Sequence, residues 1–135
     1  HIARGIPVDE NLIVHLDWSP DRMQCAFDRM ISLKEPPTAL FTTNDYIAYE
    51  FMDYAASRGI QVPRDLSVAG HGNIDKYVPR TFLTSVDQPF ELIGKAAAKR
   101  LLKRLSEMPY SLGTCQQVIL QSTLVVRDSC RKIHD

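Results

Sequence analysis

The chain has 135 residues, of which 44% are hydrophobic and 24% are charged, and its formal net charge at pH 7 is zero. This length and balance allow one packed domain or one lobe of a larger protein, and they exclude a disordered or low-complexity chain. The equal numbers of basic and acidic residues argue against a nucleic-acid-binding module, and no apolar run is long enough to span a membrane.

The cysteines bear on the redox compartment of the protein, and the first residue bears on whether the sequence is part of a longer one. Cys25, Cys115 and Cys130 are odd in number and share no metal-type spacing, which favours a reducing, cytoplasmic compartment. Cys25 lies on an apolar helical stripe, so we expect it to be a small core residue. Because the chain begins at His1 without a signal peptide, we expect a piece of a longer protein.

The first predicted elements are a strand and a helix. The apolar run Leu12–Leu16 has the length of a strand, and Ser19 followed by Pro20 is a favourable helix start. Pro36 and Pro37 end this helix. Its apolar face is made by residues three or four apart: Met23, Phe27, Met30 and Ile31.

A second strand, a second helix and a third strand follow. Thr38–Thr43 is a short apolar strand, and Asn44 with Asp45 supplies a cap for a helix that runs to about Arg58. Gly59 is the residue type preferred just past a helix end, and Leu66–Gly70 is the third strand. Strands alternating with helices of this length predict βαβ units, hence an α/β fold with a parallel sheet.

After the third strand, the alternation of predicted strands and helices becomes less regular. An irregular loop is expected over His71–Phe82, followed by a short strand at Leu83–Val86. A long helix is expected from about Phe90 to Glu107, and Val118–Arg127 is a final extended stretch.

Each of the three predicted strands ends at residues suited to a ligand site. In a parallel sheet these ends share one edge, where ligands bind. Trp18 offers a flat apolar face, and Asn44 offers a donor and an acceptor. His71 and Asn73 add polar groups, while Gly72 allows close approach to the backbone. Plain alternatives stay open, since Asn44 can simply cap a helix, Trp18 can be packing and His71 can be structural.

No catalytic or metal-binding motif accompanies these residues. The sequence has no Gly-x-Ser-x-Gly elbow, no His-Glu-x-x-His, no glycine-rich phosphate loop and no Cys-x-x-Cys. Its histidines (His1, His15, His71 and His134) are scattered. We therefore expect no enzyme, no cofactor and no metal site.

Several phrases match one protein family in order and spacing. They are PTALF at 37–41 with Asn44-Asp45, RGIQVPRDLSVAG at 58–70, LTSVDQPF at 83–90 and LVVR at 124–127. On these phrases the chain resembles the effector-binding domain of LacI/GalR-family bacterial transcription regulators. The resemblance implies the type I periplasmic-binding-protein-like fold, in which two α/β lobes are joined by three crossover strands and enclose the ligand.

The resemblance also implies a division of the chain. Residues 1–89 resemble the C-terminal lobe of that domain, and residues 90–112 resemble a helix that belongs to the N-terminal lobe. Residues 113–135 resemble the return strand and the C-terminal tail. Full-length family members add a helix-turn-helix headpiece that binds operator DNA, which this sequence does not contain.

The site residues that the resemblance implies are Trp18, Asn44, Gln88 and Phe90. The sequence departs from the family at Gly72, where members usually place an aspartate that contacts the ligand. Losing a charged acceptor costs a sugar hydroxyl about 1.5–3 kcal/mol of binding. Either His71 or Asn73 substitutes for that aspartate, or the effector is not a typical sugar.

The second helix is the expected dimer interface. Tyr46, Tyr49 and Asp53 lie toward one side of it, and the family places this helix between subunits. Tyrosine is favoured at such interfaces, although these residues can also cover the sheet or lie singly on the surface.

The function expected is the effector-sensing and dimerisation part of a LacI-type transcription regulator. A sugar-like or nucleoside-like effector would bind in the cleft, the protein would be a cytoplasmic homodimer, and this chain alone would not bind operator DNA. The alternative is a solute-binding protein of a transport system with the same fold. A third variant joins the same sensor to another type of DNA-binding domain.

Overall fold

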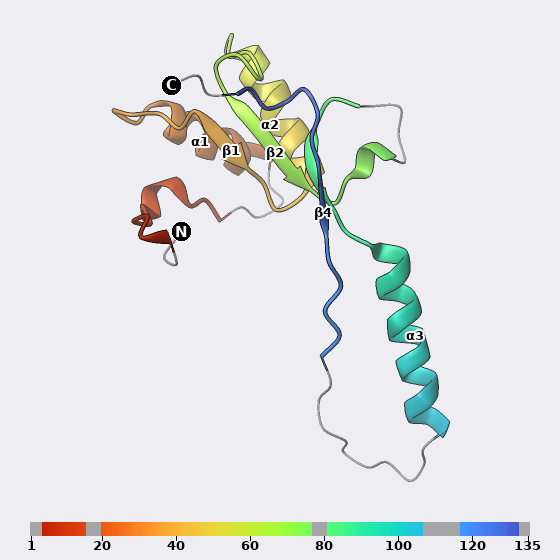
Figure 1. The fold of residues 1–135 in the computed structure, drawn as a ribbon. Coiled ribbons are helices and arrows are strands. Elements are labelled where there is room, and N and C mark those ends of the chain that lie inside the picture. Colours follow the sequence, from red (N-terminus) through yellow and green to blue (C-terminus); the bar gives the residue numbers. More distant parts are fainter. Residues whose placement is uncertain (1–3, 16–19, 77–80, 107–116, 133–135) are drawn as a thin grey trace.

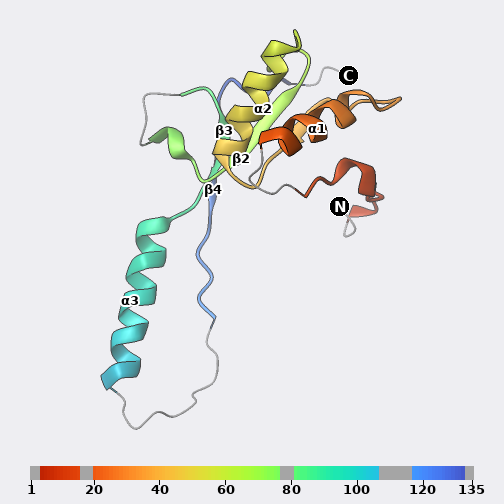
Figure 2. The same ribbon diagram turned by 180° about the vertical axis from the view of Figure 1, so that it is seen from behind.

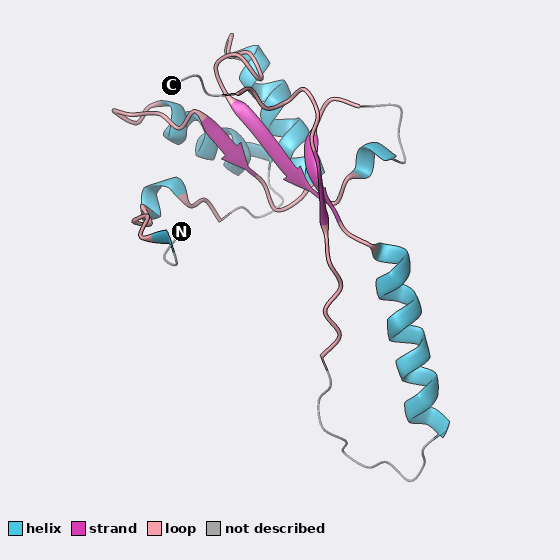
Figure 3. Ribbon diagram, viewed as in Figure 1, coloured by secondary structure: helices cyan, strands magenta, loops and turns pink. Residues whose placement is uncertain are grey.

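The computed structural model describes residues 4–15, 20–76, 81–106 and 117–132. Strands and helices alternate through the first half of the chain, as the sequence predicts (Figures 1 and 3). In chain order the elements are the 3-10 helix η2 (Glu10–Leu12), α1 (Pro20–Ile31), β1 (Ala39–Phe41), α2 (Asp45–Ser57), β2 (Ser67–His71), the 3-10 helix η3 (Ile74–Lys76), β3 (Thr84–Asp87), α3 (Phe90–Ser106) and β4 (Thr123–Val125).

The strands form one sheet in the order β1-β2-β3-β4. β1 pairs in parallel with β2, and β2 with β3, whereas β4 runs antiparallel to β3. The parallel strands confirm the predicted α/β architecture. The antiparallel strand is the extended stretch near the end of the chain, which returns to the sheet after α3. Only Thr123–Val125 of the predicted stretch is strand.

α1 and α2 lie together on one face of the sheet, where they build the core (Figures 1 and 2). Phe27 of α1 is 1% exposed, and its ring lies 5.8 Å from that of Phe51 in α2. Burying a large apolar side chain contributes about 1.5–3 kcal/mol, so these contacts hold the two layers together. The buried apolar residues are Ala26, Phe27, Met30, Ala48, Phe51, Ala55, Leu66, Val68 and Leu83.

The second helix begins and ends as its flanking residues predict. The side chain of Asn44 caps α2, since its Oδ1 accepts a hydrogen bond of 2.9 Å from the backbone N–H of Ile47. Gly59 has a φ of 77°, the left-handed conformation that glycine adopts at little cost just past a helix. This cap fixes where Asn44 lies relative to the end of β1.

The residues after β4 fasten the chain into the sheet at the amino ends of β2 and β3. The backbone oxygen of Ser129 accepts from Val68 N–H at 2.9 Å, and its N–H donates to Phe82 at 3.0 Å. The Ser129 hydroxyl accepts from Thr84 N–H at 2.7 Å and donates to the oxygen of Val68 at 2.6 Å. The segment therefore joins two neighbouring strands.

Two predictions about the first part of the chain are wrong. Residues 13–15 of the predicted strand Leu12–Leu16 are irregular, because Asp9 caps a 3-10 turn just before them and no strand pairs with them. β1 is left at the sheet edge, with Phe41 62% exposed. Cys25 is exposed rather than in the core, because α1 turns Ala26 and Phe27 inward instead.

α3 runs away from the sheet and its helices (Figure 1). None of its residues is buried, although it carries an apolar set on its surface. These exposed residues are Phe90, Leu92, Ile93, Leu101, Leu102 and Leu105. Among the described residues, no helix has the length and hydropathy needed to cross a membrane.

Candidate functional site

The parallel strands bring the predicted site residues to one edge of the sheet. β1, β2 and β3 point the same way, so their carboxyl ends lie side by side. Asn44 follows β1, His71 ends β2 and Gln88 follows β3. We call the residues at these ends, Thr42–Asn44, His71–Asn73 and Gln88, the carboxyl edge. Trp18 lies outside the described residues.

His71 and Gln88 meet at this edge. Gln88 Nε2 lies 2.8 Å from His71 Nδ1 and 3.1 Å from Nε2, and both side chains are half-buried. The contact leaves the Gln88 carbonyl as an acceptor and the imidazole as a second polar group. An amide and an imidazole side by side suit hydroxyl groups or ring nitrogens of a ligand.

Gly72 and Asn73 differ in what they offer to a ligand. Gly72 is buried with a φ of 123°, and its N–H donates to the oxygen of Val86 at 2.8 Å. Asn73 is 4% exposed, and its Oδ1 accepts from Arg127 Nη2 at 2.6 Å. The side chain of Asn73 is thus engaged inside the protein. Of the two predicted substitutes for the family's aspartate, His71 is the one more open to a ligand.

A buried carboxyl group, which the sequence did not single out, supports the edge from inside. Asp45 is 0% exposed at the start of α2, and its Oδ1 accepts from the Ser85 hydroxyl at 2.6 Å. Its Oδ2 accepts from the backbone N–H of Ile74 at 2.7 Å. Asp45 therefore ties α2 to β3 and to the turn that follows Gly72.

Arg127 is a second residue without a role assigned from the sequence. Its guanidinium donates to the backbone oxygen of Leu83 at 2.6 Å as well as to Asn73, and lies 3.9 Å from Asp75 Oδ2. The Asp75 side chain is 1% exposed and accepts from the Tyr49 hydroxyl at 2.7 and 2.8 Å. This chain of contacts runs from the residues after β4 to α2.

An ion pair lies beside the carboxyl edge. Lys76 Nζ donates to Asp87 Oδ1 at 2.5 Å and lies 6.0 Å from the centre of the Phe90 ring. The hydrogen bond from Lys76 lowers the pKa of Asp87, burial opposes this, and a hydrogen bond from Asn73 lowers it further. Phe90 is 48% exposed and so is open to a ligand or to another lobe.

A groove of about 270 Å³ adjoins the end of β1. Its lining includes Thr42 and Thr43 after β1, and Val14 and His15 from the segment before α1. The groove places space for a small molecule next to Asn44. Within the part of the chain that the structure describes, no cluster of side chains could hold a metal ion.

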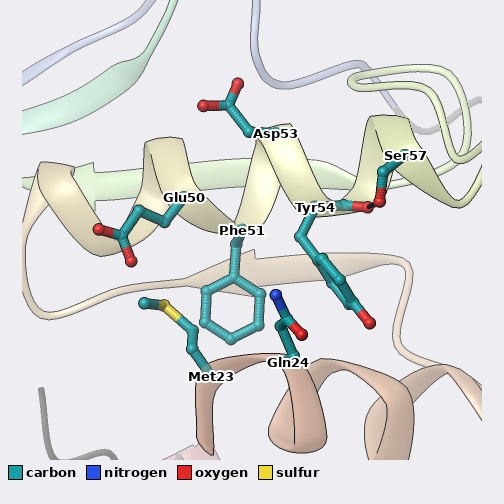
Figure 4. Close-up of a pocket in the computed structure, with 7 residues that line it drawn as sticks. All are labelled: Met23, Gln24, Glu50, Phe51, Asp53, Tyr54 and Ser57. Carbon is teal, nitrogen blue, oxygen red and sulfur yellow. Dashed lines mark hydrogen bonds between the residues drawn. The ribbon is translucent and has the colours of Figure 1, made fainter. Parts of the chain in front are cut away.

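The residues predicted for a dimer interface lie differently on α2. Tyr46 is 64% exposed and Asp53 is also exposed, whereas Tyr49 is half-buried and directed to Asp75. A surface groove of about 480 Å³ lies between α1 and α2, and Figure 4 shows Phe51 pointing from α2 toward α1. The groove is lined by Met23, Gln24, Glu50, Phe51, Asp53, Tyr54 and Ser57.

Comparisons with known proteins define the family. A model of the periplasmic binding protein-like domain matches residues 5–130, so the chain belongs to this family, in the form found in LacI-type regulators, as the resemblance predicted.

Curated relatives are named as repressors. The chain is 38% identical over 104 residues to the HTH-type transcriptional repressor PurR of Vibrio atlanticus, a match that covers 76% of this chain and 31% of the relative. It is 34% identical over 136 residues to the probable HTH-type transcriptional repressor ExuR of Bacillus subtilis, covering 98% of this chain and 39% of the relative. The chain thus spans less than half the length of either relative.

Several solved structures with this fold are regulators as well. A putative LacI transcriptional regulator from Bacillus cereus superposes with a TM-score of 0.81 at 26% identity, covering 98% of this chain and 46% of that chain. The regulator CelR in complex with cellobiose gives a TM-score of 0.75 at 26% identity, covering 95% and 38%. The carboxyl edge therefore belongs to a fold that holds a sugar in one neighbour.

Proposed function

We propose that the chain is the effector-sensing and dimerisation part of a cytoplasmic, LacI-type transcription regulator that binds operator DNA through a separate headpiece. The observation that carries this proposal is the convergence of Asn44, His71 and Gln88 on one edge of a parallel sheet, in a chain whose relatives are named repressors. These names favour a regulator over a transport protein. They also favour a binding role over an enzyme.

In this proposal the effector contacts the carboxyl edge and Phe90, and Trp18 and Gly72 contribute to the same site. The binding groups are the amides of Asn44 and Gln88 and the imidazole of His71, which suit a sugar-like or nucleoside-like molecule. Asn73 acts here mainly through its internal contacts with Arg127. Effector binding shifts the population between two arrangements of the lobes, and the dimer passes that shift to the headpieces.

The exposed residues of α3 and α2 support the proposed assignment of the segments to two lobes and a dimer interface. In the proposal, residues 1–89 form the C-terminal lobe and residues 90–112 pack on the N-terminal lobe. Residues 113–135 return to the C-terminal lobe. The exposed Leu101, Leu102 and Leu105 of α3 require such a partner, because a helix with an apolar face gains its stability by burying it. Tyr46 and Asp53 on the outer side of α2 belong to the dimer interface.

The site is tested by a thermal-shift screen of the full-length regulator against sugars, nucleosides and sugar phosphates, followed by calorimetry. Gln88→Ala and Asn44→Asp should each weaken a bound compound about tenfold or more, because each removes a hydrogen bond from a buried ligand. Asn44→Asp retains the capping oxygen and replaces the amide donor with a carboxylate oxygen, so a loss of affinity reports ligand contact rather than a weaker helix.

The matched control is Gln61→Ala, which removes an exposed glutamine from the turn after α2. It should leave affinity unchanged. Unchanged affinity in both Gln88→Ala and Asn44→Asp would refute the assignment of the site.

A further inference from the structure

We propose that Arg127 is a positioning residue of the carboxyl edge. It does not belong to the edge itself, since it follows β4, 54 residues further along the chain than Asn73. Its guanidinium nevertheless holds the turn formed by residues 72–76, which begins at the edge and ends beside α2. The consequence for effector binding rests on the function proposed above.

The turn is held from three directions. From inside, the N–H of Asn73 donates to the Ser85 hydroxyl at 3.0 Å, and Asp45 accepts from Ile74. From α2, the Tyr49 hydroxyl donates to Asp75. From the residues after β4, Arg127 donates to Asn73. Asn73 has a φ of 52°, a conformation that costs a non-glycine residue energy and persists only where surrounding contacts impose it.

The geometry of Arg127 requires its fork of donors. One nitrogen reaches the oxygen of Leu83 and the other reaches Asn73, so both bonds come from one planar fork, whose geometry a single ammonium nitrogen does not reproduce. The Arg127 side chain is only 15% exposed and that of Asp75 only 1%, which limits competition from water. Arg127 therefore holds the turn through two hydrogen bonds of defined direction as well as through its charge.

The position of Arg127 gives this contact a role in sensing. The residues after β4 are continuous with residues 117–122, which lead into β4 (Figure 1). A displacement of that segment acts on Asn73 through Arg127, and on Tyr49 of α2 through Asp75. Arg127 thus connects the carboxyl edge, which we assign to the effector, with α2, which we assign to the dimer interface.

Amide hydrogen exchange on the 135-residue chain tests the proposal without any effector, so a failure to find an effector leaves the result intact. In Arg127→Lys, exchange of the Asn73 and Ile74 amides should rise at least about tenfold, because a charge-assisted bond to the turn is lost. Exchange of Phe51 and Ala55 in α2 should change far less. Arg64→Lys, the same substitution at an exposed ion pair, is the matched control.

A double-mutant cycle with Asn73→Gly then separates positioning from general stability. Glycine tolerates the positive φ at this site and removes the oxygen that Arg127 binds. Arg127→Lys should have little further effect on the Ile74 amide in that background. Equal rises at all four amides, no rise at any, or full additivity in the cycle would overturn the proposal. If Arg127→Lys does not fold, an Ile74 amide that stays protected in Asn73→Gly overturns it as well, and a deprotected one supports it.

Discussion

Gly70→Ala should lower the free energy of unfolding by about 3 kcal/mol or more, because there is no room for a methyl group between β2 and Asp45. A Cβ at Gly70 would lie 2.2 Å from Asp45 Oδ1 and 3.0 Å from Leu83 Cδ2. Asp45 is fully buried and held by Ser85 and Ile74, so it moves aside only by breaking those bonds. Urea denaturation followed by circular dichroism measures the loss.

Gly94→Ala is the matched control for this effect. Gly94 lies in the exposed helix α3, and no atom would come within 4 Å of an added Cβ. The substitution should raise helix content slightly, since alanine is favoured over glycine by about 1 kcal/mol in a helix interior. If Gly70→Ala unfolded at the same urea concentration as the unaltered protein, the close packing of Asp45 against β2 would be refuted.

Ser129→Ala should cost about 2–4 kcal/mol, the second large effect, because it leaves the buried Thr84 N–H without its partner and leaves the Val68 oxygen with only the weak thiol donor of Cys130. The Ser129 hydroxyl accepts from Thr84 N–H and donates to the oxygen of Val68, and Ser129 is 0% exposed. Water cannot reach the vacated positions to compensate. The free energy of unfolding, taken from the same denaturation experiment, should fall by this amount.

Ser57→Ala provides the comparison. Ser57 is exposed at the end of α2, where its hydroxyl donates to the oxygen of Tyr54 at 2.6 Å. Substitutions at such surface positions change stability by less than about 0.5 kcal/mol. Equal effects of the two serine substitutions would show that the Ser129 hydroxyl does not help to fasten β2 to β3.

The sequence predicts α2 and its flanking strands because their limits depend on local chemistry. Asn44 caps the helix through a bond to Ile47 three residues away, and Gly59 adopts the conformation that ends it. The run Leu12–Leu16 looked like a strand on the same local grounds. A strand needs a neighbour to pair with, however, and the residues before it adopt a capped 3-10 turn instead.

The carboxyl edge follows from the same reasoning, since parallel strands place their ends together. Its supports could not be predicted in this way. Asp45 reads as part of a helix cap, and its partner Ser85 is 40 residues away. Arg127 appears in the sequence only as the end of a family phrase, although it binds Asn73 across 54 residues. Contacts of this range depend on register between strands, which a pattern of residues does not reveal.

The internal contact of Asn73 has the same origin. The sequence predicts Asn73 as a polar group of the ligand site because it follows a strand. The structure engages it with Arg127, which makes its role in the carboxyl edge a supporting one. Tyr49 is a parallel case, because its hydroxyl is directed to Asp75 rather than outward like that of the exposed Tyr46.

The central claim is that this chain senses an effector on behalf of a DNA-binding regulator. The most direct test measures the operator affinity of the full-length protein by fluorescence anisotropy at one fixed salt concentration, with and without a compound that binds it. The account predicts that the compound changes operator affinity about fivefold or more, the usual scale of coupling between two sites. A compound that binds at the carboxyl edge and leaves operator affinity unchanged would contradict the account.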